Sequence, residues 1–188
     1  MSKGGAEVAP LSRKQIRALA DGVREYFNVK SAKFPIVEVV ELVLPRVYKG
    51  FLLEVLPEAE MGDNHGLTMP EYGVIQIRED VYNRARAGEG RDRMTIAHEF
   101  GHLLLHQGVA LARSPSGIAL PAYKDPEWQA KAFAGELLIS HRHLAKCREA
   151  IDLVSRFGVS SDAAEIQWRA FKKEGTDREA QKMKEPEL

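Results

Sequence analysis

The segment from Met94 to His106, MTIAHEFGHLLLH, constrains the fold most, because it sets two histidines four residues apart in an apolar run. Four residues advance an α-helix by slightly more than one turn, so His98 and His102 lie on one helical face. Apolar residues at helical spacing can bury the rest of the segment: Ile96, Ala97, Phe100, Leu103 and Leu104. The pattern predicts a largely buried helix that presents two imidazoles side by side.

The same segment spells His-Glu-x-x-His, which suits the chemistry of a zinc ion. The imidazoles of His98 and His102 can meet one ion, and Glu99 lies about a quarter turn from His98, where it reaches a water on that ion. A zinc-polarised water and a carboxylate base are the minimum equipment for hydrolysing a peptide bond. We therefore predict Glu99 as a general base. The pattern alone leaves open a core helix with two hydrogen-bonded histidines and an exposed glutamate.

A catalytic zinc site needs a third protein ligand, and the residues after the motif narrow the choice. A metzincin-type arrangement would require glycine and histidine where this chain has Leu105 and Gly108, which argues against that class. His106 lies one turn beyond His102. Three histidines along one straight helix cannot converge on a tetrahedral ion, so we expect His106 to cap the helix or donate a structural hydrogen bond.

A second helix, expected from Pro126 to about residue 139 with Asp125 as its cap, offers two carboxylates. Glu127 shares a face with Ala130 and other small apolar residues that would let two helices approach closely. Glu136 lies about half a turn away in projection and is expected to face outward. We predict Glu127 as the third ligand, although the helix dipole also favours an ordinary glutamate in a first turn.

These ligands predict one Zn²⁺ per chain, held by two histidines and one glutamate, with Mn²⁺ as the alternative ion. The donor that would stabilise an oxyanion stays open among four side chains: Tyr72, Tyr123, His141 and His143.

Composition excludes several classes of protein. The 27 basic residues balance the 27 acidic ones, which removes the simplest argument for a nucleic-acid binder. The single cysteine, Cys147, permits no internal disulfide and fits a reducing compartment. Residues 1–10 lack the apolar stretch of a signal peptide, and no apolar run approaches membrane-spanning length. We expect a cytoplasmic protein without membrane or direct nucleic-acid contacts.

Periodicity predicts an α+β fold, a mostly helical single domain with a small three-stranded sheet packed beside the motif helix. Helices are expected at 12–28, at 35–44 with Pro45 as its stop, at 79–87 and near 140–150, with strands at 51–56, 67–69 and 74–77 and a polar loop at 58–64. The chain is expected to divide into a flexible leader at 1–11, one domain at 12–173 and a charged tail at 174–188. Within the domain, a helix pair at 152–173 would cap the core.

Several motifs together resemble the ImmA/IrrE family of bacterial and phage metallopeptidases. They are Ile75-x-Ile77, Tyr82, the run from Arg93 to His106, the block from Glu127 to Leu138 and the stretch from Leu153 to Ala164. The resemblance covers roughly residues 50–172. It implies that His98, His102 and Glu127 bind zinc and that Glu99 is the catalytic base. The chain departs from the family pattern at Lys131, at Ile139-Ser140 and at Gln167-Trp168, none of which belongs to the metal set.

The resemblance also implies a substrate. Members of the family typically cleave a helix-turn-helix repressor and so release genes of mobile elements or of a stress response. The function expected here is therefore a zinc-dependent endopeptidase acting on such a repressor, encoded nearby. The alternative is a zinc-stabilised regulatory protein, an anti-repressor or a toxin–antitoxin component, that binds a repressor without cutting it, with residues 152–173 as its docking surface.

Overall fold

The computed structural model describes residues 7–108 and 120–182, with side chains as far as residue 175. Its elements in chain order are α1 (Arg13–Tyr26), α2 (Ile36–Glu38), the π-helix η1 (Val39–Val43), α3 (Leu44–Val47), β1 (Leu52–Leu56), α4 (Glu58–Met61), β2 (Gly66–Met69), the 3₁₀ turn η2 (Pro70–Tyr72), β3 (Val74–Arg78), α5 (Glu79–Ala87), α6 (Gly90–Leu105), the 3₁₀ turn η3 (Ala122–Lys124), α7 (Pro126–Leu138), α8 (His141–Leu144), α9 (Ala150–Phe157) and α10 (Ser161–Lys182). The expected α+β class, mostly helical with one three-stranded sheet, is confirmed.

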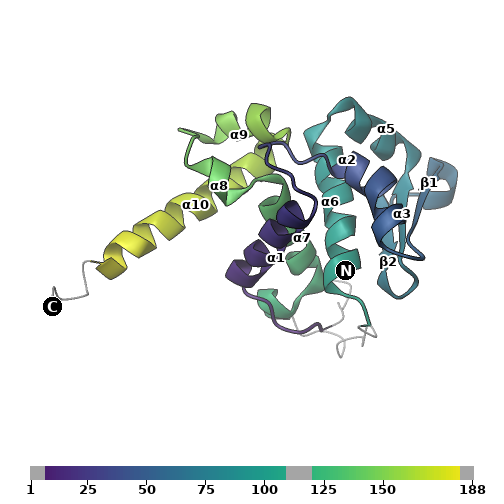
Figure 1. The fold of residues 1–188 in the computed structure, drawn as a ribbon, viewed down its shortest axis with the longest axis horizontal. Coiled ribbons are helices and arrows are strands. Elements are labelled where there is room, and N and C mark those ends of the chain that lie inside the picture. Colours follow the sequence, from purple (N-terminus) through teal and green to yellow (C-terminus); the bar gives the residue numbers. More distant parts are fainter. Residues whose placement is uncertain (1–6, 109–119, 183–188) are drawn as a thin grey trace.

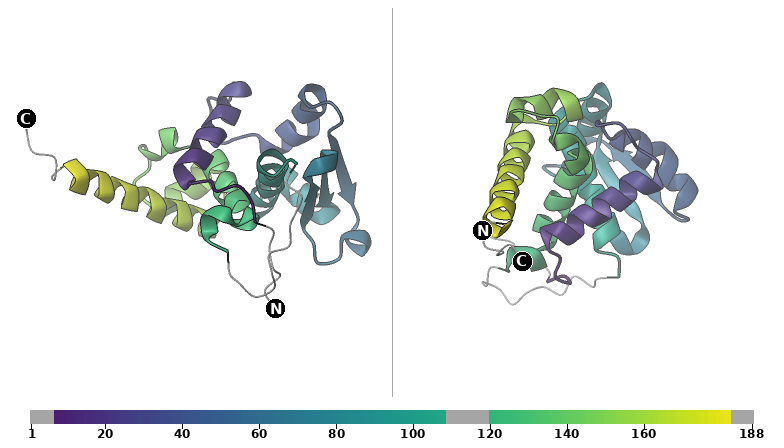
Figure 2. Two further views of the ribbon diagram at one scale, coloured as in Figure 1. Left: turned by 90° about the horizontal axis from the view of Figure 1, so that it is seen from below. Right: turned by 60° about the vertical axis from the view of Figure 1, so that its left-hand side comes forward.

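Helix α6 lies at the centre of the described fold (Figure 1). The sheet packs on one side of it and α7 on the other, with α1 lying across α7 (Figure 2). Large side chains from the sheet and from both helices are fully buried in one shared core, among them Ile75, Ile77, Ile96, Phe100, Phe133 and Leu137. The residues of α6 are therefore held from two sides, which fixes the helix that bears the motif.

The sheet has the strand order β1-β3-β2. Strand β1 pairs parallel to β3, and β2 pairs antiparallel to β3 with Gly66 opposite Ile77 and Met69 opposite Val74. The expected hairpin is confirmed, and Gly73 makes its turn possible with a φ of 68°. Strand β2 lies at an edge of the sheet and contacts α6.

Helix α1 begins as the sequence predicts. The Ser12 side chain accepts a hydrogen bond from the Gln15 N–H, and the Gln15 side chain accepts one from the Ser12 N–H. The two bonds form a capping box. At the other end, buried Arg24 donates to the backbone oxygen of Leu137 in α7 at 2.8 Å. The bond from Arg24 joins α1 to α7.

Two expectations are wrong, one about the end of a helix and one about a loop. Pro45 does not stop its helix, because the π-helical turn ends before it and Pro45 falls in the first turn of α3, where no N–H is needed. Residues 58–64 are not entirely loop, since Glu58–Met61 form a helical turn after Pro57. Glu58 and Glu60 in that turn suit the positive end of a helix.

The N-terminal residues that the structure describes pack on the core. Val8 is buried, and its N–H donates to the Lys124 oxygen at 3.1 Å. The N–H of Leu11 donates to the Tyr123 oxygen at 2.9 Å. Residues 1–6 of the expected leader and 183–188 of the expected tail lie outside the described residues, while α10 continues through the tail region as far as Lys182 (Figure 1). None of the described helices combines the length and apolar character needed to cross a bilayer.

Candidate metal centre

Helix α6 presents both motif histidines at its surface because its opposite face is committed to the core. Ile96, Ala97 and Phe100 are at most 2% exposed, whereas the side chains of His98 and His102 are 19% and 16% exposed. The two rings stand one helical turn apart with their centroids 4.6 Å from each other. Their Nε2 atoms are 3.1 Å apart.

Helix α7 brings a carboxylate to these rings. Asp125 caps the helix by accepting a hydrogen bond from the Glu127 N–H at 2.9 Å, which places Glu127 in the first turn. The helices approach closely where Gly101 of the motif faces Ala130. A Cβ at position 101 would lie 3.2 Å from both the Cα and the oxygen of Ala130. The small residues at this crossing therefore let Glu127 reach α6.

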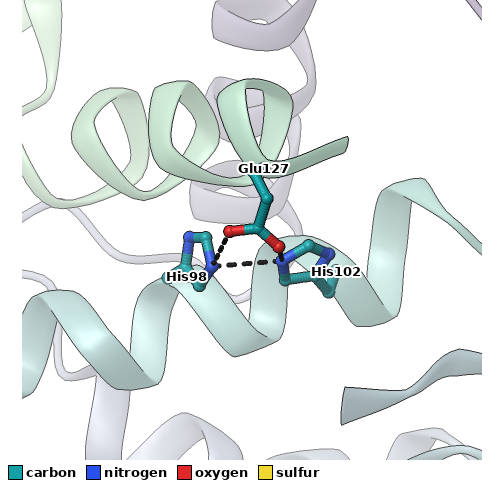
Figure 3. A group of neighbouring side chains, drawn as sticks. All are labelled: His98, His102 and Glu127. Carbon is teal, nitrogen blue, oxygen red and sulfur yellow. Dashed lines mark hydrogen bonds and ion pairs between the residues drawn. The ribbon is translucent and has the colours of Figure 1, made fainter. Parts of the chain in front are cut away.

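Figure 3 shows Glu127 extending from α7 toward the two imidazoles of α6. Its Oε2 lies 3.4 Å from His98 Nε2, and its Oε1 lies 3.2 Å from His102 Nε2. One ligand atom from each of the three residues lies within 4.8 Å of the others. The structure thus brings together the three side chains that the sequence proposes as ligands. Their binding of zinc stays a prediction.

The spacing fits a tetrahedral zinc ion. Two ligand atoms bound at about 2.1 Å with a tetrahedral angle are about 3.4 Å apart. The three separations here are 3.1, 3.4 and 3.2 Å. Two neutral imidazoles can also direct both Nε2 lone pairs at a shared cation, whereas facing lone pairs without one would repel. The donor set, two imidazoles and a carboxylate, is the set of a catalytic zinc site with a position left for water.

The site opens toward solvent on the side of α7. The Glu127 side chain is 57% exposed, far more than either histidine. Hydrogen bonds with His102 and His98 hold the pKa of Glu127 well below its usual range. The carboxylate is therefore ionised at neutral pH and available to a cation.

Glu99 projects from α6 toward the sheet, about a quarter turn around the helix from His98. It is only 6% exposed, and its Oε2 accepts a hydrogen bond from the Thr68 hydroxyl at 2.7 Å. Gly66 of the same strand leaves room for the carboxylate, because a Cβ there would lie 2.6 Å from Glu99 Cγ. The edge strand β2 therefore confines the Glu99 side chain beside the two histidines.

The surroundings of Glu136 differ from the expectation that it faces outward. It does lie away from the histidines, but it is buried at 2% exposure rather than facing outward. Arg13 and Arg17 of α1 bond to its two oxygens at 2.8 and 2.7 Å. Helical periodicity gave the direction of Glu136 correctly and could not reveal that α1 covers that side of α7.

Sequence reasoning also missed residues around the site. Thr68 fell inside the strand expected at 67–69 and Gly66 just before it, and neither was predicted as a site residue, although a glycine inside a strand is a known sign of a close approach. Gln129 gave no signal at all, yet it is buried at 1% exposure near the C-terminal end of α6. His106 was expected to cap that helix or donate a structural hydrogen bond, and it occupies the C-cap.

The four candidates for an oxyanion donor divide between two places. Tyr72 and Tyr123 lie in 3₁₀ turns and are 70% and 48% exposed. His141 packs on Phe171 of α10, and His143 packs on Phe157 of α9. The two histidines thus pack against the C-terminal helices, whereas the two tyrosines are exposed.

His-Glu-x-x-His on a helix, joined by a carboxylate from another part of the chain, is a pattern typical of metallopeptidases. The family model for the IrrE N-terminal-like domain, Peptidase M78, matches residues 58–169, more than half of the chain. The chain belongs to this family, the ImmA/IrrE metallopeptidases. Membership implies a bound metal and a protein substrate. A search of curated proteins found no match.

Proposed function

We propose that this protein is a zinc-dependent endopeptidase in which His98, His102 and Glu127 hold the ion and Glu99 is the base. The observation that supports this most is the near-tetrahedral spacing of the three ligand atoms, at 3.1 to 3.4 Å. A bound zinc ion would supply Lewis-acid activation of water and of the scissile carbonyl. Mn²⁺ is the alternative ion.

Glu99 carries the proton in this proposal. Its carboxylate accepts a proton from the attacking water and delivers it to the leaving amine nitrogen as the peptide bond breaks. The Thr68 hydroxyl donates a hydrogen bond to Glu99 Oε2 at 2.7 Å, so Glu99 Oε1 is the oxygen that would take the proton of the water. Burial against β2 limits the side chain to few positions, so little rearrangement is needed at the moment of transfer.

Strand β2 supports the choice of a polypeptide as substrate. It lies at the edge of the sheet and contacts the helix that bears Glu99. An extended peptide could add to that edge by main-chain hydrogen bonds and so lie along the metal centre. We infer that the substrate is a helix-turn-helix repressor encoded nearby, cleaved in the cytoplasm to release stress-response or mobile-element genes.

The domain proposal follows the same lines. Residues 12–173 would form the peptidase domain, with the helix pair at 152–173 as its cap and 174–188 as a charged tail. Helices α9 and α10 pack on each other, and α10 then extends away from the body of the fold (Figure 1). That projection favours the second candidate function, in which the pair docks a repressor that the protein binds without cutting.

The test is to mix the purified, zinc-loaded protein with the adjacent repressor and follow the repressor's mass over time. Two fragments are expected from the wild type, and none from Glu99→Gln with its zinc content unchanged. An intact repressor that is nevertheless captured by the wild type in a pull-down would favour the binding protein. Cleavage by Glu99→Gln at the wild-type rate would overturn the assignment of the base.

A further inference from the structure

His106 connects the metal centre to a buried glutamine. Its ring is 2% exposed, and Nδ1 lies 3.0 Å from Nδ1 of His102. Its other nitrogen, Nε2, lies 3.2 Å from Oε1 of Gln129 in α7. One imidazole thus touches a proposed zinc ligand on one side and a neutral amide on the other.

The amide of Gln129 has only one satisfactory orientation. Its nitrogen lies 2.8 Å from the backbone oxygens of Ala9 and Tyr123. Both of these are carbonyl groups, which can only accept, so the amide NH₂ must face them and donate both hydrogens. Oε1 is then directed at His106. Because Oε1 also only accepts, His106 must present an N–H at Nε2.

The proton at Nε2 determines the rest of the chain of bonds. A neutral imidazole has one N–H, so a His106 ring that donates from Nε2 presents a lone pair at Nδ1, which lies 3.0 Å from Nδ1 of His102. That lone pair accepts from His102, which places the His102 proton on Nδ1. The Nε2 of His102 is left unprotonated, and this is the atom that faces His98 and Glu127.

We propose that Gln129 and His106 are positioning residues that fix the His102 ring in the tautomer and orientation that bind the metal. The proposal rests on the proposed zinc site. Neither residue ligates the ion, and the effect passes through two hydrogen bonds in series. His98 differs, because its buried Nδ1 has no hydrogen-bond partner among the residues that the structure describes. The support therefore acts on one of the two histidines.

The hydrogen-bonded series Gln129–His106–His102, which we call the relay, is held in part by a residue far from the motif in the sequence. Ala9 belongs to the N-terminal segment, which is tied to residues 123 and 124 by the backbone bonds of Val8 and Leu11. Hydrogen-bond partners behind metal-binding histidines typically contribute about 10- to 100-fold in metal affinity. An effect of that size is expected for each residue of this relay.

The first experiment measures zinc affinity by competition with a chelator, with no substrate present. Gln129→Leu and His106→Leu should each weaken zinc binding about 10- to 100-fold. The double variant should bind no more weakly than His106→Leu, because both changes break the same series of bonds. Gln167→Leu is the matched control, since Gln167 is also buried, at 6% exposure, and bonds to Arg13 instead. It should bind zinc like the wild type.

The second experiment requires no variant and so cannot fail by misfolding. Long-range ¹H–¹⁵N spectra of the zinc-loaded wild type report which nitrogen of each histidine is protonated. His106 should carry its proton on Nε2, and a scalar coupling should cross the hydrogen bond between the Nδ1 atoms of His102 and His106. A His106 proton on Nδ1 would overturn the proposal.

The outcomes separate this proposal from the proposed function. Failure of the wild type to bind zinc would overturn both. Wild-type binding with equal affinity in Gln129→Leu and His106→Leu would overturn only the relay. Loss of affinity that adds fully in the double variant would also overturn it, because two independent structural effects would then be acting.

Discussion

Thr68 Oγ1 lies 2.7 Å from Oε2 of Glu99 and 3.0 Å from the same residue's backbone oxygen. One hydroxyl on the edge strand thus touches both the side chain and the main chain of the proposed base. Thr68→Val keeps the shape of the side chain and removes the hydroxyl. Cleavage of the repressor should slow about 10-fold, the cost of one buried hydrogen bond to a charged group, with zinc affinity unchanged. Thr68→Ser should restore most of the rate, and an undiminished rate in Thr68→Val would contradict this role.

Gly66 is expected to be intolerant of any side chain. A Cβ there would lie 2.6 Å from Cγ and 2.9 Å from Oε1 of Glu99, so Gly66→Ala must displace the carboxylate. The cleavage rate should fall by at least about 10-fold, because a misplaced base is a poor one, while zinc binding persists. Rates measured at saturating zinc test this.

The matched control for that variant is Gly22→Ala in α1, where a Cβ would meet nothing within 4 Å. Alanine in a helix interior is favoured over glycine by roughly 0.5–1 kcal/mol. The control should therefore unfold at a slightly higher temperature and cleave at the wild-type rate. Equal activity in both glycine variants would show that β2 does not confine Glu99.

Removal of zinc should destabilise the fold. Zinc at about 100 times its dissociation constant contributes about 2.7 kcal/mol to the free energy of unfolding, which corresponds to a shift in Tm of about 5–10 °C for a chain of this size. Thermal unfolding with and without a chelator measures the shift. His98→Ala should show the lower Tm in both conditions, and elemental analysis should find no zinc in it. Retained zinc would contradict the ligand assignment.

Glu136 should matter for stability and not for the metal. Glu136→Leu leaves Arg13 and Arg17 without the carboxylate that they share at 2.8 and 2.7 Å. We expect a loss of about 3 kcal/mol, the lower end for a broken buried pair, because both arginines keep some contact with solvent. Urea unfolding of the metal-free protein measures it.

The two glutamates of α7, Glu127 and Glu136, are expected to differ in their effect on zinc affinity. Glu136→Leu should bind zinc within about twofold of the wild type, whereas Glu127→Leu should lose it, since a carboxylate is one of three protein ligands. A zinc defect in Glu136→Leu as large as that in Glu127→Leu would show that the two residues act on one site.

Much of the candidate site follows from local sequence. Four-residue spacing alone sets His98 and His102 on one face, and the Asp125-Pro126 start of α7 sets Glu127 in a first turn. These features depend on helical geometry and capping, which act over a few residues and need no knowledge of the rest of the chain. The hairpin of β2 and β3 was predictable for the same reason.

The packing of the chain determines which element covers each face of α6 and α7. Periodicity shows that Glu136 turns away from the histidines, but α1 lies about 120 residues earlier and supplies the arginines that bury it. The partners of Glu99 come from β2, and the amide of Gln129 is oriented in part by the backbone of Ala9. A hydrogen bond between distant segments depends on how helices and strands pack, and side-chain spacing along one element contains no information about its neighbours. The proposed ligands and base therefore follow from residue type and spacing along the chain, whereas the bonds that hold them in place depend on how distant segments pack.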